Sequence, residues 1–317
     1  MATANRPAVE LDDVDRALIA ELIRDGRATY AGLAPGVGLS QAAVRTRVQR
    51  LLDDNIITIT GRVDPSSFGL GVFGFAFLEA SREVDKLAAL VAEVDEAVFV
   101  VAGAGRFDLL VELRCENNDA LVGALDRIRV LEGIRRLSSV TVLHYEKQDW
   151  TGVGNRDAKP SPKPDAALGH EFDDIDRQLL QGLMADGRAT YSALAPAVGL
   201  SQAAVRDRVI DLLDAGIITI QAHPVPEAMG IAGFAGLAVK ASGPVAPLAK
   251  ALTSLPESTI VVRTLGRYDI LAEVWFESND HLADVLDQLR ELPGMGSIDT
   301  LPYLWIALEE FDSGPKR

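Results

Sequence analysis

The stretch LDDVDRALIAELIRDGRATYAGLAPGVGLSQAAVRTRVQRLLDDNIITI, residues 11–59, returns at residues 172–220 as FDDIDRQLLQGLMADGRATYSALAPAVGLSQAAVRDRVIDLLDAGIITI. The two stretches align without gaps at an offset of 161 residues, and roughly two thirds of their positions are identical. The offset persists further along the chain, where Gly133 corresponds to Gly294. Self-similarity at a fixed offset indicates repeated structural units. The chain therefore consists of one unit of about 150 residues present twice.

The composition is that of ordinary globular domains, with 317 residues, 48% of them apolar and 24% charged. Cys115 is the one cysteine, so no disulfide can form within the chain, which fits a reducing compartment. No apolar run reaches the roughly 20 residues that span a bilayer. Residues 1–7 lack the apolar core of a secretory signal. We therefore expect a cytoplasmic protein with no membrane partner.

The formal net charge of −15 argues, taken alone, against a nucleic-acid partner, because phosphate binding requires Lys and Arg. A basic cluster on one helix can nevertheless bind DNA while the rest of the molecule is acidic. Composition therefore leaves DNA binding open.

The start of each copy predicts three short helices. Asp12 or Asp13 is the expected N-cap of the first, whose apolar residues share one face: Val14, Leu18, Leu22 and Ile23. This helix is expected to end near Asp25, with Gly26 as a left-handed cap. A second helix is expected over residues 30–34, followed by a break at Pro35, Gly36 and Gly38. The third begins after the N-cap Ser40 and turns its apolar residues inward: Val44, Val48 and Leu51. Two helices joined by a glycine-containing turn match a helix-turn-helix.

The outward face of the third helix carries side chains suited to reading DNA bases. Arginine binds guanine bidentately, glutamine binds adenine, and alanine or threonine contacts the thymine methyl. We predict DNA contacts from Ser40, Gln41, Ala42, Arg45, Thr46, Gln49 and Arg50, with Arg47 near the edge, and in the second copy from Ser201, Gln202, Arg206 and Arg208. The alternative is a solvated face, because Arg and Gln are simply good helix formers. The preceding helix and turn favour the first interpretation, in which this helix binds double-stranded DNA.

The two copies differ on this face, where Thr46 becomes Asp207 and Arg50 becomes Asp211. Residues 11–62 contain seven arginines and seven acidic residues, whereas residues 172–223 contain four arginines and seven aspartates. Carboxylates that face phosphates are repelled. We therefore expect the first copy to supply most of the DNA affinity, and Arg50→Ala to weaken binding more than Arg208→Ala.

The remainder of each copy alternates strand and helix patterns in the order β-α-β-β-α-β, a ferredoxin-like split unit. The expected elements are 71–78, 84–94, 97–102, 107–114, 118–129 and 134–145 in the first copy, and 231–240, 245–254, 259–265, 268–276, 280–291 and a strand from about 297 in the second. The fold class is thus α+β, with a helix-turn-helix domain plus a βαββαβ domain repeated twice. The predicted domain ranges are 11–62, 63–150, a Pro- and Gly-rich linker at 151–170, 171–223 and 224–311.

Two short signatures in this second domain are candidates for ligand contacts. One lies at a strand–strand turn, Gly105, Arg106, Phe107 and Asp108, with its counterpart Gly266, Arg267, Tyr268 and Asp269. Its alternative is a plain hairpin turn. The other opens a helix, Asn117, Asn118 and Asp119, with its counterpart Ser278, Asn279 and Asp280. Its alternative is simple helix capping.

Each copy resembles the leucine-responsive/asparagine regulator (Lrp/AsnC) family along nearly its whole length. The residues that carry the resemblance are Asp15, Asp25-Gly-Arg-Ala28, Leu33-Ala34, Val37-Gly-Leu-Ser40, Val44, Arg47-Val48, Leu51, Ile56-Ile57, Val63-Asp-Pro65, Gly69 and Gly105-x-x-Asp108. The resemblance implies a DNA-binding transcriptional regulator whose regulator (RAM) domains dimerise through their sheets. It also implies an amino acid or similar effector, bound near the loop at Gly105 to Asp108. We expect no cofactor and no metal.

The chain departs from the family pattern because the usual member carries a single copy. The two copies are expected to pair with each other as a built-in pseudo-dimer, and such chains to associate further as dimers or tetramers. Two other classes remain open. One is a sensor without DNA binding, favoured by the acidic balance. The other is an enzyme resembling haem-pathway decarboxylases, for which the histidines are His144, His170, His223 and His281.

Overall fold

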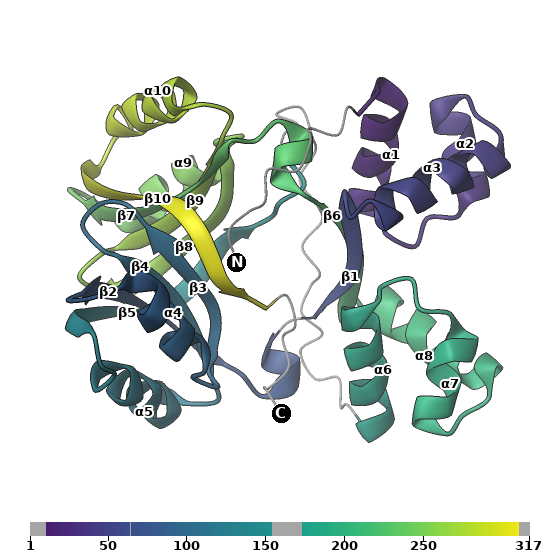
Figure 1. Cartoon of the computed structure of the whole chain (residues 1–317), viewed down its shortest axis with the longest axis horizontal. Helices are drawn as coiled ribbons and strands as arrows, with labels where there is room; N and C mark the ends of the chain where they lie inside the picture. The colour runs from purple at the N-terminus through teal and green to yellow at the C-terminus, as the bar shows by residue number, and fades with distance from the viewer. Residues whose placement is uncertain (1–10, 64, 154–172, 311–317) are drawn as a thin grey trace. The chain divides into compact units, whose positions relative to one another are not determined.

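The computed structural model describes residues 11–63, 65–153 and 173–310, which form two compact units (Figure 1). The helix-turn-helix unit contains the described residues up to Ser67 and those from Asp173 to Gly230. The barrel unit contains Phe68 to Val153 and Ile231 to Glu310. Each unit thus combines the equivalent domains of both copies, which the sequence presents far apart.

Capping side chains define where the helices of the first unit begin. The Asp12 carboxylate accepts the Asp15 N–H, and the Asp15 side chain accepts the Asp12 N–H, which makes a reciprocal capping box. Ser40 Oγ accepts the N–H of Ala43 at 3.2 Å, so the predicted N-cap is confirmed. The helices are α1 Asp13–Arg24, α2 Tyr30–Val37 and α3 Gln41–Asp53, then α6 Asp174–Ala185, α7 Tyr191–Val198 and α8 Gln202–Asp214. The predicted inward residues of α3 are fully buried: Val44, Val48 and Leu51.

The predicted break at Pro35 is wrong. Pro35 lies inside α2, which continues to Val37 and ends at Gly38 with a left-handed φ of 66°. Proline removes one backbone donor from the helix. The carbonyl that loses this bond belongs to Ala31, an exposed residue, so water can take the donor's place.

The predicted left-handed cap at Gly26 is also wrong, although α1 does end beside it. The C-cap is Asp25, with an extended φ of −142°. A side chain at Gly26 would place its Cβ 2.8 Å from Ile59 Cγ2 and 3.0 Å from the Gln221 backbone nitrogen. The glycine is therefore required by the close approach of two strands, one from each copy.

These strands are β1 (Ile57–Val63) and β6 (Ile218–Pro224), which pair antiparallel from Ile57↔Pro224 to Val63↔Ile218. A lone two-stranded ribbon is marginal in water. Here α1 packs against β6 and α6 against β1, so each copy covers the other's strand. The helix-turn-helix domains are thus joined within one chain, which confirms the expected pseudo-dimer for this unit.

The βαββαβ order predicted for each copy is confirmed. Short 3-10 turns at Pro65–Phe68 and Pro226–Met229 precede it. The first copy contains β2 Val72–Ala80, α4 Val84–Ala92, β3 Ala97–Gly103, β4 Leu109–Cys115, α5 Asn118–Arg129 and β5 Ile134–Gln148. The second contains β7 Gly233–Ala241, α9 Val245–Thr253, β8 Ser258–Gly266, β9 Ile270–Phe276, α10 Asn279–Arg290 and β10 Met295–Glu309.

The two sheets close into one barrel with the strand order β10-β3-β4-β2-β5-β8-β9-β7. The last strand of each copy makes this closure. β5 pairs first with β2 and then with β8 of the other copy, while β10 pairs first with β7 and then with β3. Register shifts along both strands, such as that between Val142 and His144, accommodate the bend. Closure removes the open sheet edges.

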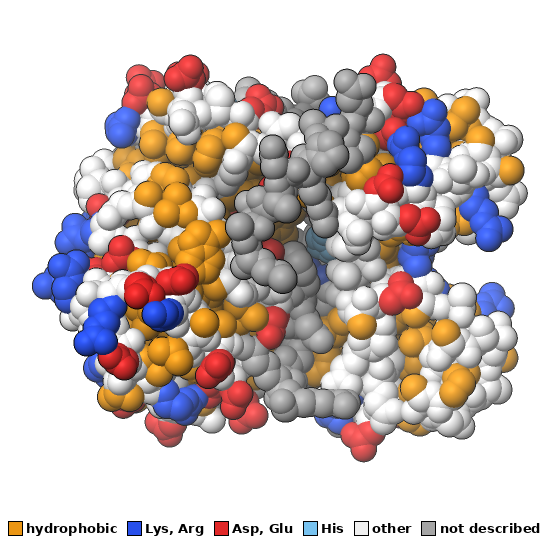
Figure 2. All heavy atoms as spheres, viewed as in Figure 1, with side chains coloured by type: hydrophobic (Ala, Val, Ile, Leu, Met, Phe, Trp, Pro, Cys, Tyr) orange, Lys and Arg blue, Asp and Glu red, His pale blue; other side chains and the backbone are white. Residues whose placement is uncertain are grey.

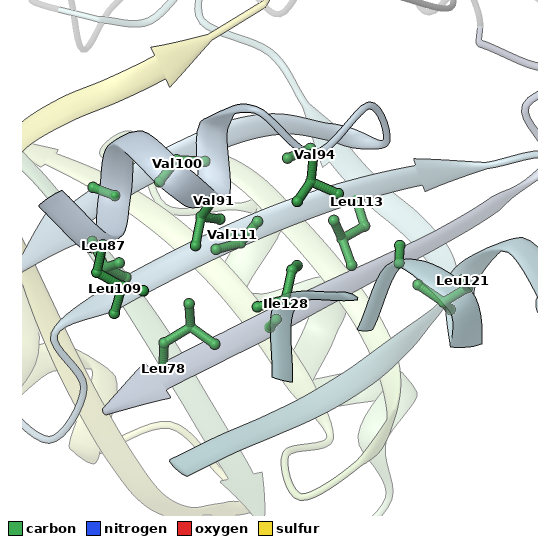
Figure 3. Packing of buried hydrophobic residues seen from close by; sticks show 14 of the residues in the cluster. Leu78, Leu87, Val91, Val94, Val100, Leu109, Val111, Leu113, Leu121 and Ile128 are labelled. Atoms are coloured by element: carbon green, nitrogen blue, oxygen red, sulfur yellow. The ribbon is translucent and has the colours of Figure 1, made fainter. Parts of the chain in front are cut away.

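Separate apolar cores hold the outer helices and the barrel interior. Figure 3 shows Leu87 and Val91 of α4 directed at strand residues such as Val100 and Leu109. A second such core lies under α9 and α10. Between the sheets lies an interior cluster drawn from both copies, which includes Phe75, Phe77, Phe107, Val262 and Tyr268. Among the residues that the structure describes, none of the helices has the length and the apolar character needed to span a bilayer.

The predicted linker falls mostly outside the described residues, which resume at Asp173. Its first residues belong instead to the barrel unit, where Thr151 and Val153 are buried. Beside them, the Trp150 indole N–H donates to Glu273 Oε1 at 3.3 Å.

Candidate nucleic-acid interface and sensor site

The exposed face of α3 contains most of the side chains that we predicted to contact DNA: Gln41, Ala42, Arg45, Thr46 and Gln49. Two of them are held by their own helix. Thr46 Oγ1 donates to the Ala42 carbonyl at 3.1 Å, and Gln49 Nε2 donates to Asp53 Oδ1 at 2.9 Å. No hydrogen bond or ion pair joins the Arg45 side chain to another described residue. Arg45 is therefore available to a partner molecule.

Arg47 and Arg50 are placed differently from our prediction, because both bind the carboxylate of Asp15. Arg47 Nη1 lies 2.9 Å from Asp15 Oδ1 and 2.6 Å from Asp12 Oδ2, and Arg50 Nη2 lies 2.5 Å from Asp15 Oδ2. Asp15 is 1% exposed, so its charge needs these partners. The Asp15 N–H and then Arg47 lower the pKa of Asp12. These arginines fasten α3 to the start of α1.

The second copy repeats this arrangement with one arginine fewer. Arg208 Nη1 lies 2.7 Å from Asp176 Oδ1 and 2.8 Å from Asp173 Oδ2. Asp211, which is exposed, occupies the position of Arg50. The predicted contacts Gln202 and Arg206 are exposed, and no ion pair joins Arg206 to another described residue. Ser201 Oγ is engaged as the N-cap of α8, accepting the Ala204 N–H at 3.2 Å.

Reciprocal arginines across the two copies were missed by our reasoning from sequence. Arg27 donates to the Gly187 carbonyl at 2.9 Å and to the Ala189 carbonyl at 3.2 Å, and its guanidinium lies 5.0 Å from the Tyr191 ring centroid. Arg188 mirrors it, with a bond to the Ala28 carbonyl at 3.1 Å. The sequence feature that could have predicted these contacts is the hexapeptide DGRATY, which is identical in both copies although its arginine makes no contribution to the helix pattern.

In the barrel unit, the glycine and aspartate of each predicted turn are structural. Gly105 and Gly266 have φ values of 139° and 146°, a region that favours glycine. Asp108 accepts the N–H of Ala80 at 2.7 Å, and Asp269 accepts the N–H of Ala241 at 2.9 Å. Both carboxylates thus pin the turn to the end of a neighbouring strand, β2 or β7.

The two turns meet inside the barrel through their aromatic residues. Phe107 and Tyr268 are each 4% exposed, and their ring centroids lie 6.4 Å apart. Arg106 and Arg267, which precede them, are exposed. Figure 2 shows basic side chains at the edge of the barrel unit where β2 and β7 end. The two turns therefore lie together, with the aromatic rings buried and the guanidinium groups of Arg106 and Arg267 exposed, both near the Phe107 ring.

The predicted Asn and Asp pairs do not join these turns within a copy. Asn118 and Asp119 open α5 after the far end of β4, a strand of seven residues that begins directly after Asp108. That strand spans roughly 23 Å. The capping alternative is confirmed for the first residue of each predicted set: Asn117 accepts the Ala120 N–H, and Ser278 accepts the His281 N–H. Asn279 and Asp280 follow the cap as the first residues of α10.

Two glutamates at equivalent positions, Glu112 and Glu273, lie buried in the barrel and were not predicted as notable. Glu112 Oε1 accepts Arg114 Nε at 2.9 Å, while Glu273 Oε1 accepts the Thr259 hydroxyl at 2.6 Å. Burial raises the pKa of Glu273, and the nearby Glu112 adds to the shift. The signal was a glutamate at the centre of an apolar strand in both copies.

The three histidines that the structure describes lie on three different elements. His144 lies on β5, His223 on β6 and His281 on α10, while His170 lies outside the described residues. Burial lowers the pKa of His223 to about 4. Within residues 11–63, 65–153 and 173–310, no three His, Cys, Asp or Glu side chains are arranged to hold a metal ion. Cys115 is buried, and burial raises the pKa of its thiol to about 11.

Comparison with known proteins shows what these units are similar to. The AsnC-type helix-turn-helix domain matches residues 11–52 and 172–213, and the Lrp/AsnC ligand binding domain matches residues 75–150 and 234–310. The transcriptional regulator LrpA of Mycobacterium tuberculosis is 38% identical over 136 residues, 41% of this chain and 89% of LrpA. The regulator FL11 of Pyrococcus furiosus is 26% identical over 140 residues, 44% of this chain and 93% of FL11.

A solved structure resembles most of the chain in fold. The siroheme decarboxylase NirDL has a TM-score of 0.64 with 11% sequence identity, covering 94% of this chain and 93% of NirDL. At that identity the likeness concerns the fold alone. Because both family domains match in both copies, over most of the chain, the protein belongs to the Lrp/AsnC family of transcription regulators, with its helix-turn-helix and ligand-binding domains present twice.

Proposed function

We propose that the chain regulates transcription by binding double-stranded DNA sequence-specifically through α3 and α8 together. The observation that carries the proposal is the exposure of Arg45 and Arg206, without ion-pair partners among the described residues, at the same position of two helices that one β-ribbon joins. Arginine reads guanine bidentately in the major groove. In helix-turn-helix dimers, the N-terminal residues of the second helix reach the base edges.

The first copy supplies most of the DNA affinity in this proposal. Around Arg45, α3 exposes Thr46 and Gln49, whereas α8 exposes Asp207 and Asp211 beside Arg206. Carboxylates on the reading face are repelled by phosphates. An intramolecular pair of unlike helices fits an operator with two unlike half-sites, because palindromic operators mirror identical subunits.

The barrel unit, in the same proposal, responds to an amino acid or a similar small effector near its turns. The match to the Lrp/AsnC ligand binding domain supports this assignment. The protein acts in the cytoplasm without a membrane partner, cofactor or metal, and its chains associate as dimers or tetramers. The proposal assigns it no catalytic reaction. Conversion of a tetrapyrrole carboxylate by the purified protein would contradict that part.

Footprinting upstream of the protein's own gene, followed by gel shifts on the protected sequence, tests the DNA-binding proposal. Arg45→Ala is expected to weaken binding by about tenfold or more, because one bidentate base contact is worth about 1–3 kcal/mol. Arg206→Ala should cost less. Arg82→Ala, which removes an exposed arginine of the barrel unit paired with Glu132, is the matched control. If footprinting finds no protected sequence, the proposal of DNA recognition is rejected. If Arg45→Ala and Arg206→Ala weaken DNA binding equally, the proposed asymmetry between the copies is rejected.

A further inference from the structure

The closed barrel contains two seams at which one copy meets the other. At one seam, β5 of the first copy pairs with β8 of the second, and at the other, β10 of the second copy pairs with β3 of the first. The offset of 161 residues relates the two seams residue by residue, so identical copies would make identical seams. Two first copies from different chains would then pair as well as a first copy and a second one.

The β5–β8 seam carries an ion pair that the β10–β3 seam lacks. Arg263 Nε lies 2.6 Å from Glu146 Oε1, and the two side chains are 35% and 23% exposed. The equivalent residues at the other seam are Ala102 and Ala307. Glu146 and Ala307 each lie at a register shift of the last strand of their copy, so the two pairs occupy the same place in the barrel. The charges have therefore diverged at matched positions.

A lysine that follows this glutamate adds a second difference between the seams. Lys147 Nζ donates to three oxygens where α9 ends and β8 begins: the Thr253 carbonyl at 3.3 Å, the Leu255 carbonyl at 3.4 Å and Ser258 Oγ at 3.0 Å. A cation is favourable at the C-terminus of a helix. The equivalent position at the β10–β3 seam is Leu308, which packs against the apolar core of the first copy. The two last strands thus present different side chains to different surroundings.

Pairing of like copies would leave these charges without partners. In a barrel of two first copies, each Glu146 would face an alanine, and each Lys147 would lie on the apolar core that now receives Leu308. In a barrel of two second copies, each Arg263 would face an alanine. A partly buried charge that loses its partner destabilises the assembly. Because a barrel of like copies contains the mismatched seam twice, this penalty applies twice.

We propose that Glu146, Lys147 and Arg263 form a recognition surface that accepts the unlike copy of this chain and rejects a like copy. Such specificity is a difference between two affinities, and unpaired charges lower the affinity for the wrong partner. Attachment within one chain also favours the observed pairing, so the surface has to be tested after the attachment is cut. The inference goes beyond the proposed function and holds whether or not the chain binds DNA.

A chain cut between the copies allows each half to select its partner. A protease site inserted within residues 158–168, in the predicted linker, is cleaved in the folded protein, and both halves are unfolded together in urea and refolded. Arg106→Cys with Arg267→Cys reports the pairing, because the native guanidinium groups lie 5.8 Å and 6.0 Å from one ring centroid, that of Phe107. A short bismaleimide joins the cysteines of one barrel, and intact mass distinguishes unlike from like pairs. We expect a larger share of unlike pairs than random pairing gives.

Charge reversal at the β5–β8 seam tests the cause of this selectivity. Glu146→Arg should lower the ratio of unlike to like pairs about tenfold, because like charges across an interface repel each other. Adding Arg263→Glu should restore the ratio. Lys147→Leu should raise the share of pairs between two first halves. Glu132→Arg, which changes an exposed glutamate paired with Arg82 of its own copy, is the matched control.

The inference is overturned if the unsubstituted halves pair at random, if Glu146→Arg leaves the ratio unchanged, or if Arg263→Glu fails to restore it. It is also overturned if Lys147→Leu does not raise the share of first–first pairs. Where the cut halves do not refold, tryptophan-monitored urea unfolding of the uncut chain decides. Glu146→Arg must then lower the midpoint and Arg263→Glu restore it, while Glu132→Arg leaves it unchanged; any other pattern rejects the recognition surface.

Discussion

Arg208→Ala is expected to destabilise the helix-turn-helix unit more than Arg47→Ala, although the two arginines occupy equivalent positions. Arg47 binds Asp15 in the first turn of α1, and Arg208 binds Asp176 in the first turn of α6. In the first copy a second arginine, Arg50, also reaches Asp15. In the second copy this position is an aspartate, so Arg208 is the one arginine bound to Asp176 among the described residues.

The magnitudes follow from what each substitution leaves behind. After Arg47→Ala, the buried Asp15 keeps Arg50 at 2.5 Å, and the loss is that of a partly exposed contact, about 1 kcal/mol. After Arg208→Ala, Asp176 keeps no arginine, and its side chain is only 10% exposed. Leaving a buried charge unpaired costs about 3–5 kcal/mol, and the remaining backbone hydrogen bond from Asp173 sets the lower end, about 3 kcal/mol.

Urea unfolding measured by two probes isolates the unit concerned. The three tryptophans, Trp150, Trp275 and Trp305, all lie in the barrel unit, so their fluorescence follows that unit. Far-UV circular dichroism also follows the helices of the other unit. The combined variant Arg47→Ala with Arg50→Ala is the internal control, because it should lose about as much as Arg208→Ala. Equal losses from the two single substitutions would refute the reasoning.

Three further predictions concern other parts of the molecule. Gly26→Ala should destabilise the helix-turn-helix unit by about 2 kcal/mol in urea unfolding, because the new Cβ would clash with a strand, whereas Gly36→Ala, with nothing within 4 Å, should be neutral or slightly stabilising. Burial raises the pKa of Glu273, so the folded state retains its proton more tightly than the unfolded chain. Its contribution to stability is therefore complete below pH 4.5, the usual value, and is lost as pH rises above it. Glu273→Gln should flatten this dependence in tryptophan-monitored unfolding, and an unchanged pH profile would contradict the assignment. Cys115 is 1% exposed with a thiol pKa raised to about 11, so a disulfide reagent at pH 8 should label it only after denaturation. Rapid labelling of the native protein would show that the thiol is accessible.

The elements themselves were predictable from sequence, because their signals are local. Ser40 caps the helix whose apolar residues recur at helical spacing, and each βαββαβ domain follows from alternating patterns and glycine-containing turns. Because of the duplication, each element could be predicted from two different sequences. Local reasoning failed at two positions. Pro35 lies inside α2 instead of ending it. Gly26 is required because neighbouring strands leave no room for a side chain, and not because of its own φ.

The partners of the charged side chains were decided by the tertiary structure. Arg45 and Arg50 are both exposed on α3. The packing of α1 brings Asp15 to Arg50 but leaves Arg45 without an ion pair among the described residues. Helical periodicity shows which face a residue occupies but says nothing about what another helix presents to it. Three of the five arginines predicted to contact DNA thus bind carboxylates of their own copy: Arg47, Arg50 and Arg208.

The pairing of the copies was also beyond local patterns, although the repeat itself was plain in the sequence. Which strands meet, β1 with β6 and β5 with β8, depends on register between segments more than a hundred residues apart. That pairing brings Arg106 to Asp299 and Phe107 to Tyr268, and so turns two separate signatures into one surface. Hydrophobic patterns specify that a strand face must be buried, but only the packed chain determines against what.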